Sequence, residues 1–261
     1  MNKYKYTIII PSFNSSETII NCLESCLSQS FENYEIVIVD DCSTDNSCSL
    51  IEAYIAKNNL HLKIKLIKLC ENNGPANARN IGVEVSNSDY IALLDSDDSF
   101  YKEKLLIIDR ILTEDSSIDL IGHAYSVNEI IDNDGSSKVQ EINLISLLFR
   151  NFAVTPSVVF RKDIATRFDA SLRYTEDHDF FLRVKSDGYV IKYLDLPLVR
   201  LNRPVLSSGG LSSNKLQMRR GEMKMLTKFC TSRIKYLPLL PFLLLFSLLK
   251  HVVNFVKAVV A

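Results

Sequence analysis

The first 118 residues alternate short apolar runs with amphipathic stretches, and no other feature of the sequence constrains the fold as strongly. Four runs have the length and composition of buried strands: 6–10, 35–39, 62–69 and 90–94. The stretches that follow them carry apolar residues at helical spacing: 15–29, 48–57, 76–85 and 102–112. Ser15 or Ser16 is expected to cap the first helix. Strands alternating with helices predict an α/β fold with a doubly wound, mostly parallel, Rossmann-like sheet.

The alternation becomes irregular beyond residue 118. There we expect a polar hairpin turn at the sheet edge, a strand, a helix and another strand: 132–136, 157–160, 176–185 and 190–194. No internal repeat or low-complexity linker separates the two parts. Residues 1–235 are therefore predicted to form one domain, with halves at about 1–117 and 118–235.

Composition narrows the class of protein. The chain has 261 residues, 47% hydrophobic and 23% charged, which is enough for one sizeable core. A formal net charge of -1 argues against a nucleic-acid binder, which needs a basic surface. The six cysteines form no CxxC pair, so we expect reduced thiols, and the N-terminus shows no signal-cleavage pattern. A cytoplasmic location is expected.

Acidic residues follow the second strand directly. In a doubly wound sheet, ligands bind beyond the carboxyl ends of the strands, where Asp40 and Asp41 stand. A carboxylate there is suited to accept the N3–H of a uracil ring, with its neighbours on the ribose hydroxyls. The alternative is that these side chains only cap the next helix. The absence of GxGxxG disfavours a dinucleotide site.

The fourth strand also ends in carboxylates, in the sequence LDSDD at 94–98. Their mutual repulsion is costly unless a cation or ligand hydroxyls compensate it. Mg²⁺ or Mn²⁺, held by one or two carboxylates and completed by a substrate diphosphate, would do so. A DxD triplet also occurs by chance in surface turns, and its position at a strand end is what favours the metal.

Two further segments carry candidate site residues. Gly74-Pro75 opens a helix whose first turns hold Arg79, placed to meet a nucleotide or its diphosphate. In the second half, a helix begins with acids at 176, 177 and 179, which helix-dipole compensation alone would explain. A carboxylate there is also placed to act as a general base, and His178 is the rival candidate.

Five segments occur in an order and spacing that resemble family 2 glycosyltransferases: TIIIPSFN, IVIVDDCSTDNS, ENNGPANARNIG, YIALLDSDD and TEDHDFFLR. The resemblance covers about residues 5–215. It implies a GT-A fold, with a donor half at about 1–117 and an acceptor half at about 118–235. It also implies a UDP-sugar or dTDP-sugar donor and inversion at the anomeric carbon by single displacement.

The resemblance implies roles for individual residues. Asp41 would bind the base, Asp95 the ribose, Asp97 the metal, and Asp177 would be the general base, while Arg79 approaches the donor. The remaining donor-site candidates are Pro11, Phe13, Asp40 and Ser96, and further possible site residues are Asp98, Glu176 and His178.

One departure from the family pattern concerns the metal. Family members often carry a histidine near the diphosphate after the last strands, where this chain reads LVRLNRPV and has none. The loop that follows, SSGGLSS, resembles a loop that closes over the donor diphosphate. Its candidates to replace the imidazole are Ser208, Gly209 and Ser212.

The C-terminal segment 236–261 is apolar and follows a basic stretch. Its uninterrupted apolar run, 237–249, is shorter than the roughly 20 residues that span a bilayer. We expect a helix in the membrane interface, with its basic side toward anionic headgroups. The alternative is a helix packed on the domain or on a second copy in a homodimer.

A membrane-facing enzyme of this kind suggests a lipid-linked acceptor. The resemblance implies transfer of a hexose, glucose or galactose, to an undecaprenyl-diphosphate-linked saccharide during O-antigen, capsule or exopolysaccharide synthesis, at the inner face of the cytoplasmic membrane. Two alternatives remain: a nucleotidyltransferase, although the loop after the first strand lacks a glycine-rich phosphate loop, and a non-catalytic nucleotide-binding membrane partner.

Overall fold

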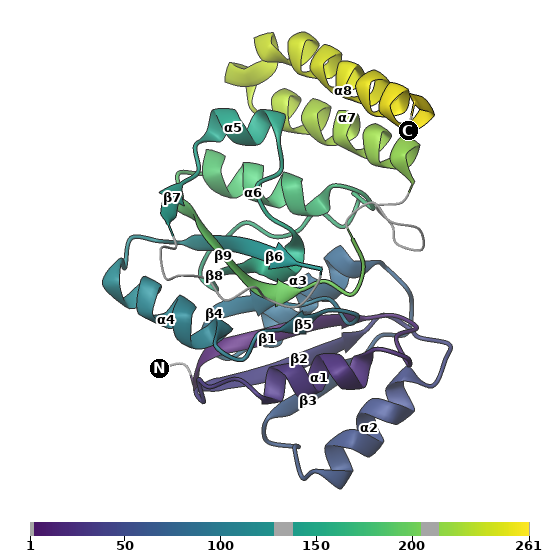
Figure 1. Ribbon diagram of the computed structural model, residues 1–261, viewed down its shortest axis with the longest axis vertical. Helices are drawn as coiled ribbons and strands as arrows, with labels where there is room; N and C mark the ends of the chain where they lie inside the picture. Colours follow the sequence, from purple (N-terminus) through teal and green to yellow (C-terminus); the bar gives the residue numbers. More distant parts are fainter. Residues whose placement is uncertain (1–2, 128–137, 205–213, 261) are drawn as a thin grey trace.

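A single sheet runs through the computed structural model, which describes residues 3–127, 138–204 and 214–260 (Figure 1). Among these residues the sheet has nine strands, with the bounds β1 Tyr4–Ser12, β2 Tyr34–Asp40, β3 Ile64–Lys68, β4 Ser88–Leu93, β5 Ser99–Phe100, β6 Leu120–Ser126, β7 Val139–Glu141, β8 Val158–Arg161 and β9 Ile191–Arg200. The four strands predicted in the first half are confirmed as β1 to β4.

The helices alternate with the strands as predicted. Their bounds are α1 Ile19–Leu27, α2 Ser47–Lys57, α3 Pro75–Val85, α4 Lys104–Glu114, α5 Leu144–Phe149, α6 Glu176–Ser186, α7 Lys215–Ser232 and α8 Leu240–Val260, with 3-10 turns η1 Thr155–Ser157 and η3 Ile234–Leu239. The predicted cap at Ser15 or Ser16 is wrong, because α1 begins at Ile19. Ser15 instead donates its backbone N–H to Ser47 Oγ and shares a hydrogen bond with Ser12 Oγ.

The strand order places the carboxyl ends of β1, β2 and β4 together. The sheet runs β3-β2-β1-β4-β8-β6-β9-β5, and β3, β2, β1 and β4 are parallel to one another. The chain moves from β1 to β2 and β3 on one side and then returns to β4 on the other. This reversal makes the topological switch point at which doubly wound sheets bind ligands.

Antiparallel pairing begins at β8, which lies between β4 and β6. The strand predicted at 190–194 extends further, as β9, because its second part pairs with β5 and with the end of β6. The strand at 157–160 and the helix at 176–185 are confirmed as β8 and α6. The predicted turn at 132–136 lies outside the described residues.

Alternate residues of β1 face two different cores. Ile8 and Ile10 belong to the cluster that includes α1, α2 and α4, whereas Ile9 belongs to the cluster that includes α3, α6 and α7. Helix α3 lies very close to the sheet, because a Cβ at Gly82 would come within 2.5 Å of Ile9 Cγ2. This alternation is the pattern expected of a sheet with helices on both faces.

The C-terminal helices add a further layer, with α7 beyond α6 and α8 beyond α7 (Figure 1). Leu243 on α8 is buried with Met225 and Phe229 of α7. Among the described residues, no helix has the length and apolarity needed to cross a membrane. All six cysteines are free thiols, as predicted.

Candidate active site

A cleft of about 2930 Å³ opens where the parallel strands end. It is lined by the loops after β1, β2 and β4, by the start of α3 and α6, and by parts of α7 and α8. Small-molecule pockets usually measure about 300–1,000 Å³. The cleft is therefore large enough for two substrates side by side.

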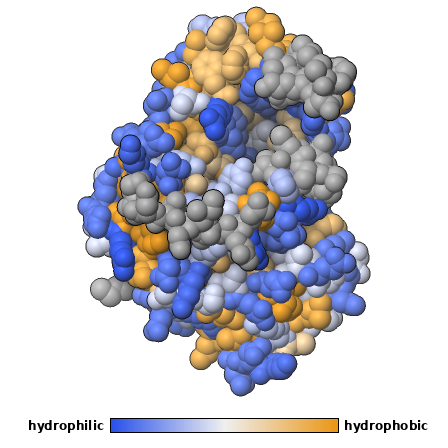
Figure 2. Space-filling model, in the orientation of Figure 1, coloured by the Kyte–Doolittle hydropathy of each residue, from blue (hydrophilic) through white to orange (hydrophobic). Residues whose placement is uncertain are grey.

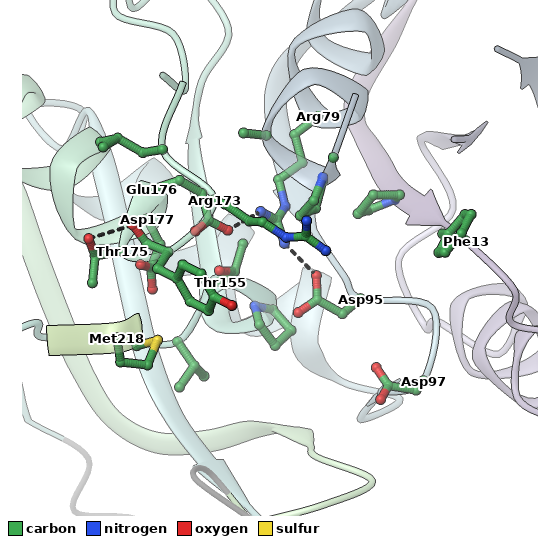
Figure 3. Close-up of a pocket in the computed structure, with 18 of the residues that line it drawn as sticks. Phe13, Arg79, Asp95, Asp97, Thr155, Arg173, Thr175, Glu176, Asp177 and Met218 are labelled. Carbon is green, nitrogen blue, oxygen red and sulfur yellow. Dashed lines mark hydrogen bonds and ion pairs between the residues drawn. The ribbon is translucent and has the colours of Figure 1, made fainter. Parts of the chain in front are cut away.

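Arg79 stands at the centre of this cleft and is 3% exposed (Figure 3). Its Nη2 donates to Asp95 Oδ1 at 2.8 Å, and its Nη1 donates to Glu176 Oε1 at 3.0 Å. Burial lowers the pKa of Arg79, but the two carboxylates outweigh it and hold that pKa above its usual value. Arg79 thus joins a residue after β4 to the first residue of α6.

Glu176 is the buried partner in this bridge. Burial raises its pKa to about 7, and the charge of Asp177 adds to the rise, while Arg79 opposes it. Because one of its oxygens is in an ion pair with Arg79, Glu176 is better suited to hold the site together than to act as a base.

Asp177 faces the cleft from the first turn of α6. Its Oδ2 accepts a hydrogen bond from Asn151 Nδ2 at 2.8 Å, and its Oδ1 accepts one from the backbone N–H of His178 at 2.7 Å. The preceding Thr175 has a left-handed backbone with φ 62°, which is uncommon for a residue with a branched side chain. Such backbone strain is often found at functional sites.

His178, the predicted rival to Asp177, is buried and bonded through Nε2 to the carbonyl of Leu147. That nitrogen donates to the carbonyl and therefore carries a proton. Burial lowers the pKa of His178, which keeps the ring neutral. This arrangement favours a structural role for His178 and leaves Asp177 as the better candidate base.

The acidic loop after β4 divides into exposed and buried members. Asp95 and Asp97 line the cleft with a third of their side-chain surface exposed, whereas Asp98 is 7% exposed. Burial raises the pKa of Asp98 to about 8, with further contributions from Asp95 and Asp97. Asp98 accepts a hydrogen bond from the backbone N–H of Asn202 at 2.9 Å and so ties this loop to the end of β9.

Asp97 makes an ion pair with Arg203 at 2.8 Å. Arg203 belongs to the LNRP segment, which follows β9 and contains no histidine. Within the described parts of the chain, no three His, Cys, Asp or Glu side chains are grouped as a metal site. The accessible carboxylate of Asp97 nevertheless fits Mg²⁺ or Mn²⁺, which commonly take one or two protein carboxylates and fill the other positions with phosphate and water.

Asp40, the last residue of β2, and Asp41, which follows it, have different surroundings. Asp41 lines the cleft and accepts backbone hydrogen bonds from Asn73 at 2.9 Å and Gly74 at 2.7 Å. Asp40 is buried, is not among the cleft residues, and accepts two hydrogen bonds from Ser43. The structure thus brings Asp41 to the site and uses Asp40 to cap a turn.

The remaining predicted donor residues can be placed directly. Pro11, Phe13 and Ser96 line the cleft, and Phe13, which lies across the cleft from Asp177 in Figure 3, is 48% exposed. An exposed aromatic face at this position is suited to stacking on a planar base. Ser208, Gly209 and Ser212 lie outside the described residues.

Two cleft residues close to Asp177 and Arg79 had not been predicted from the sequence. Asn151, which contacts Asp177, comes from the segment between α5 and η1, where no motif marks it. Arg173 lies beside Arg79 in Figure 3 and has no hydrogen bond or ion pair with any residue the structure describes. An arginine three residues before Glu176 gives no signal, because its direction depends on the turn that precedes α6.

A sequence model described as glycosyl transferase family 2 matches residues 7–171. The amylovoran biosynthesis glycosyltransferase AmsB of Erwinia amylovora is 28% identical over 74% of this chain and 67% of its own length. An uncharacterized glycosyltransferase of Haemophilus influenzae is 27% identical over 76% of this chain and 66% of its own. The succinoglycan biosynthesis protein ExoO of Rhizobium meliloti is 30% identical over 66% of this chain and 53% of its own.

Two solved structures show the same architecture. Staphylococcus aureus TarS 1-349 in complex with UDP-GlcNAc superposes with a TM-score of 0.69, 22% identity and coverage of 87% of this chain and 66% of that one. The mannosyltransferase PcManGT of Pyrobaculum calidifontis, in complex with GDP-Man and Mn²⁺, superposes with a TM-score of 0.67 and 14% identity. The match covers 98% of this chain and 76% of that one. At these identities the likeness shows the fold, GT-A, as predicted. The chain spans about two thirds of the length of the first two relatives, AmsB and the Haemophilus protein.

Proposed function

Because the chain belongs to glycosyltransferase family 2, we propose that it transfers a hexose from a UDP-sugar to a lipid-linked saccharide, with inversion at the anomeric carbon. One observation carries this proposal. The cleft at the switch point holds Asp41, Asp95 and Asp97 on the strand side and Asp177 on the other side, within a space large enough for donor and acceptor.

The strand side of the cleft is assigned to the donor. Phe13 and Asp41 would hold the uracil and Asp95 the ribose, while Arg173 supplies an unengaged guanidinium for the diphosphate. Asp97 would hold Mg²⁺ or Mn²⁺, which neutralises charge on the departing diphosphate when it is bound. Two structures of the same fold support this choice of ligands, since TarS 1-349 was solved in complex with UDP-GlcNAc and PcManGT in complex with GDP-Man and Mn²⁺.

Asp177 is assigned as the general base. A single displacement needs a carboxylate that takes the proton of the acceptor hydroxyl as that oxygen attacks the anomeric carbon. The hydrogen bonds from Asn151 and from the backbone of His178 orient the Asp177 carboxylate and stabilise its charged form. Asn151 is thus a positioning residue for the base.

The relatives support surface polysaccharide synthesis as the setting. AmsB and ExoO are named for amylovoran and succinoglycan biosynthesis, and TarS for transfer of N-acetylglucosamine to poly(ribitol-phosphate). We infer exopolysaccharide, capsule or O-antigen assembly for this chain. The family match argues against the nucleotidyltransferase alternative.

The outer surface of η3 and α8 is assigned to the inner face of the cytoplasmic membrane. Exposed apolar side chains gather there, at the top of Figure 2: Ile234, Leu237, Leu239, Phe242, Leu245, Leu248 and Leu249. Lys235, an exposed basic residue next to Ile234 in the chain, suits anionic headgroups.

Flotation with vesicles of phosphatidylglycerol and phosphatidylethanolamine tests this surface. Replacing Leu245 and Leu249 with serine should lower vesicle binding while leaving UDP affinity unchanged, and high salt should lower binding further. Vesicle binding equal to that of the unaltered chain, or a concentration-dependent dimer that the serine variant abolishes, would reassign the surface to a second copy.

Transfer itself is tested with radiolabelled UDP-glucose, UDP-galactose and UDP-GlcNAc, each offered to lipid extracts that contain undecaprenyl-diphosphate saccharides. We expect label in the lipid phase with one donor and Mn²⁺, and background label with Asp177→Asn. Label that appears equally with Asp177→Asn would remove Asp177 as the base, and failure with every donor would contradict the proposed reaction.

A further inference from the structure

The cleft does not end at the catalytic carboxylate. It continues between α5, α7 and α8, where its lining includes Arg150, Lys215, Arg219, Lys250 and a single acid, Glu222. We propose that this distal end of the cleft binds the diphosphate that joins the acceptor saccharide to its lipid. The inference rests on the proposed function and assigns a subsite to its acceptor.

The distal end carries more positive charge than its own acid neutralises. Lys250 Nζ lies 2.5 Å from one oxygen of Glu222, and Arg219 pairs with the other. Two cations thus share one carboxylate that is 9% exposed. A surplus charge in such a largely buried place is costly unless an anion compensates it.

Unused hydrogen-bond donors line the same cleft. Arg219 Nε is buried without a hydrogen-bond partner among the described residues. Arg150 and Lys215 also line the cleft, and neither makes a side-chain hydrogen bond or ion pair with a residue that the structure describes. Several unused donors of one sign along a cleft are the chemistry that phosphate groups require.

A direct chain of contacts joins this cluster to the catalytic carboxylate. Lys250 Nζ donates to the carbonyl of Phe149 at 3.1 Å, and Asn151, two residues further on, donates to Asp177. Two residue steps span at most about 7 Å of extended backbone. The charges of both Asp177 and Lys250 also act on the pKa of His178, an α6 residue whose ring is hydrogen-bonded to the Leu147 carbonyl of α5. A short saccharide would therefore reach from the base to the cluster.

Apolar side chains around the cluster indicate that the phosphate carries a hydrocarbon chain. Phe149 and Phe246 meet edge to face, with ring centroids 5.1 Å apart, beside Lys250. From Phe246 the exposed leucines of α8 continue outward on the same helix. The lipid chain attached to a bound diphosphate would pack along these apolar side chains, whereas a free nucleotide has no hydrocarbon chain to contact them.

Farnesyl diphosphate is a suitable probe, titrated calorimetrically into the full chain in EDTA so that the donor site lacks its metal. We expect binding that UDP does not displace and that farnesol, which lacks the phosphates, does not reproduce. Arg150→Ala and Lys215→Ala should each weaken it about tenfold, because each removes one charge-assisted contact. Neither variant removes a partner from a described residue, so folding should be preserved.

Arg220→Ala is the matched control, since Arg220 is an exposed cation on the same helix that does not line the cleft. Its affinity for farnesyl diphosphate should equal that of the unaltered chain. Three results would overturn the subsite. The first is displacement of the probe by UDP, and the second is that Arg220→Ala weakens probe binding as much as Arg150→Ala and Lys215→Ala do. The third is that Arg150→Ala and Lys215→Ala weaken binding to phosphatidylglycerol vesicles but leave binding of farnesyl diphosphate unchanged. Failure of UDP with Mn²⁺ to bind in a separate titration would contradict the proposed donor instead.

Discussion

Arg79→Met removes the guanidinium that bridges Asp95 and Glu176 while keeping most of the buried aliphatic volume. Asp95 has 33% of its side chain exposed and can be hydrated, but Glu176 has only 13% exposed. Breaking a buried ion pair from one side typically costs about 3–5 kcal/mol. Protonation limits that cost, since burial already raises the pKa of Glu176 to about 7. We therefore expect a loss of about 3 kcal/mol at neutral pH.

For a chain of this size, such a loss lowers the melting temperature by about 6–12 °C. The sign of the pH dependence follows from the raised pKa of Glu176, which rises further without Arg79. A group whose pKa is higher in the folded state stabilises it below the unfolded pKa, and this stabilisation disappears as the pH rises through the folded pKa. The deficit of Arg79→Met should thus be small at pH 5 and large at pH 8.

Thermal unfolding followed by circular dichroism at both pH values measures the effect. The double variant Arg79→Met with Glu176→Gln is the control, because it removes the stranded charge and should recover much of the loss at pH 8. A melting temperature for Arg79→Met within about 2 °C of the unaltered chain at pH 8 would refute the reasoning, and so would a double variant no more stable than the single one.

Three further predictions concern two cleft residues, Asp177 and Arg203, and the stabilising carboxylate of Asp45. Asp177→Asn should lower the transfer rate by about 10²–10⁴-fold while UDP affinity, measured by calorimetry, stays the same; a matching loss of UDP affinity would contradict this. Arg203→Ala should bind Mn²⁺ up to about fivefold more tightly, because it frees Asp97 from a half-exposed ion pair; unchanged Mn²⁺ affinity would show that the pair does not compete. Burial raises the pKa of Asp45, but hydrogen bonds from Ser47 and Ser16 outweigh it and lower that pKa to about 2. The Asp45 carboxylate therefore stabilises the folded chain above about pH 4, and this stabilisation disappears as the pH falls through 2. Urea denaturation should show Asp45→Asn less stable at pH 7 and equal to the unaltered chain near pH 2, and a constant difference would be the contrary result.

The first half of the fold was predictable because local patterns there coincide with the final contacts. The apolar runs at β1, β2 and β4 are buried on both faces and therefore appear as uninterrupted hydrophobic segments. The acids at 95 and 97 stand at the end of such a run, so their position beside the cleft followed from the strand alone. The antiparallel part was less predictable, because β5 and β7 are two and three residues long and exist only through pairing with β9.

Residues whose role depends on distant partners could not be predicted. Glu176 resembles a dipole-compensating acid, and only the approach of α3 to α6 reveals its ion pair with Arg79. Asp40 and Asp41 are neighbours in the sequence, yet Asp40 accepts hydrogen bonds from the nearby Ser43, whereas Asp41 accepts them from Asn73 and Gly74, more than 30 residues away. The cluster around Glu222 likewise requires α8 to fold back along α7.

The central claim is that the cleft binds a nucleoside diphosphate through a metal at Asp97. Its most direct test is the melting temperature of the purified chain with UDP, GDP, CDP or dTDP, each with Mn²⁺ and with EDTA, since a ligand that binds only the folded state raises it. We expect an increase with UDP that requires Mn²⁺ and that Asp97→Asn abolishes. A well-folded chain whose melting temperature no nucleotide changes, or a UDP effect that Asp97→Asn leaves intact in Mn²⁺, would contradict the account.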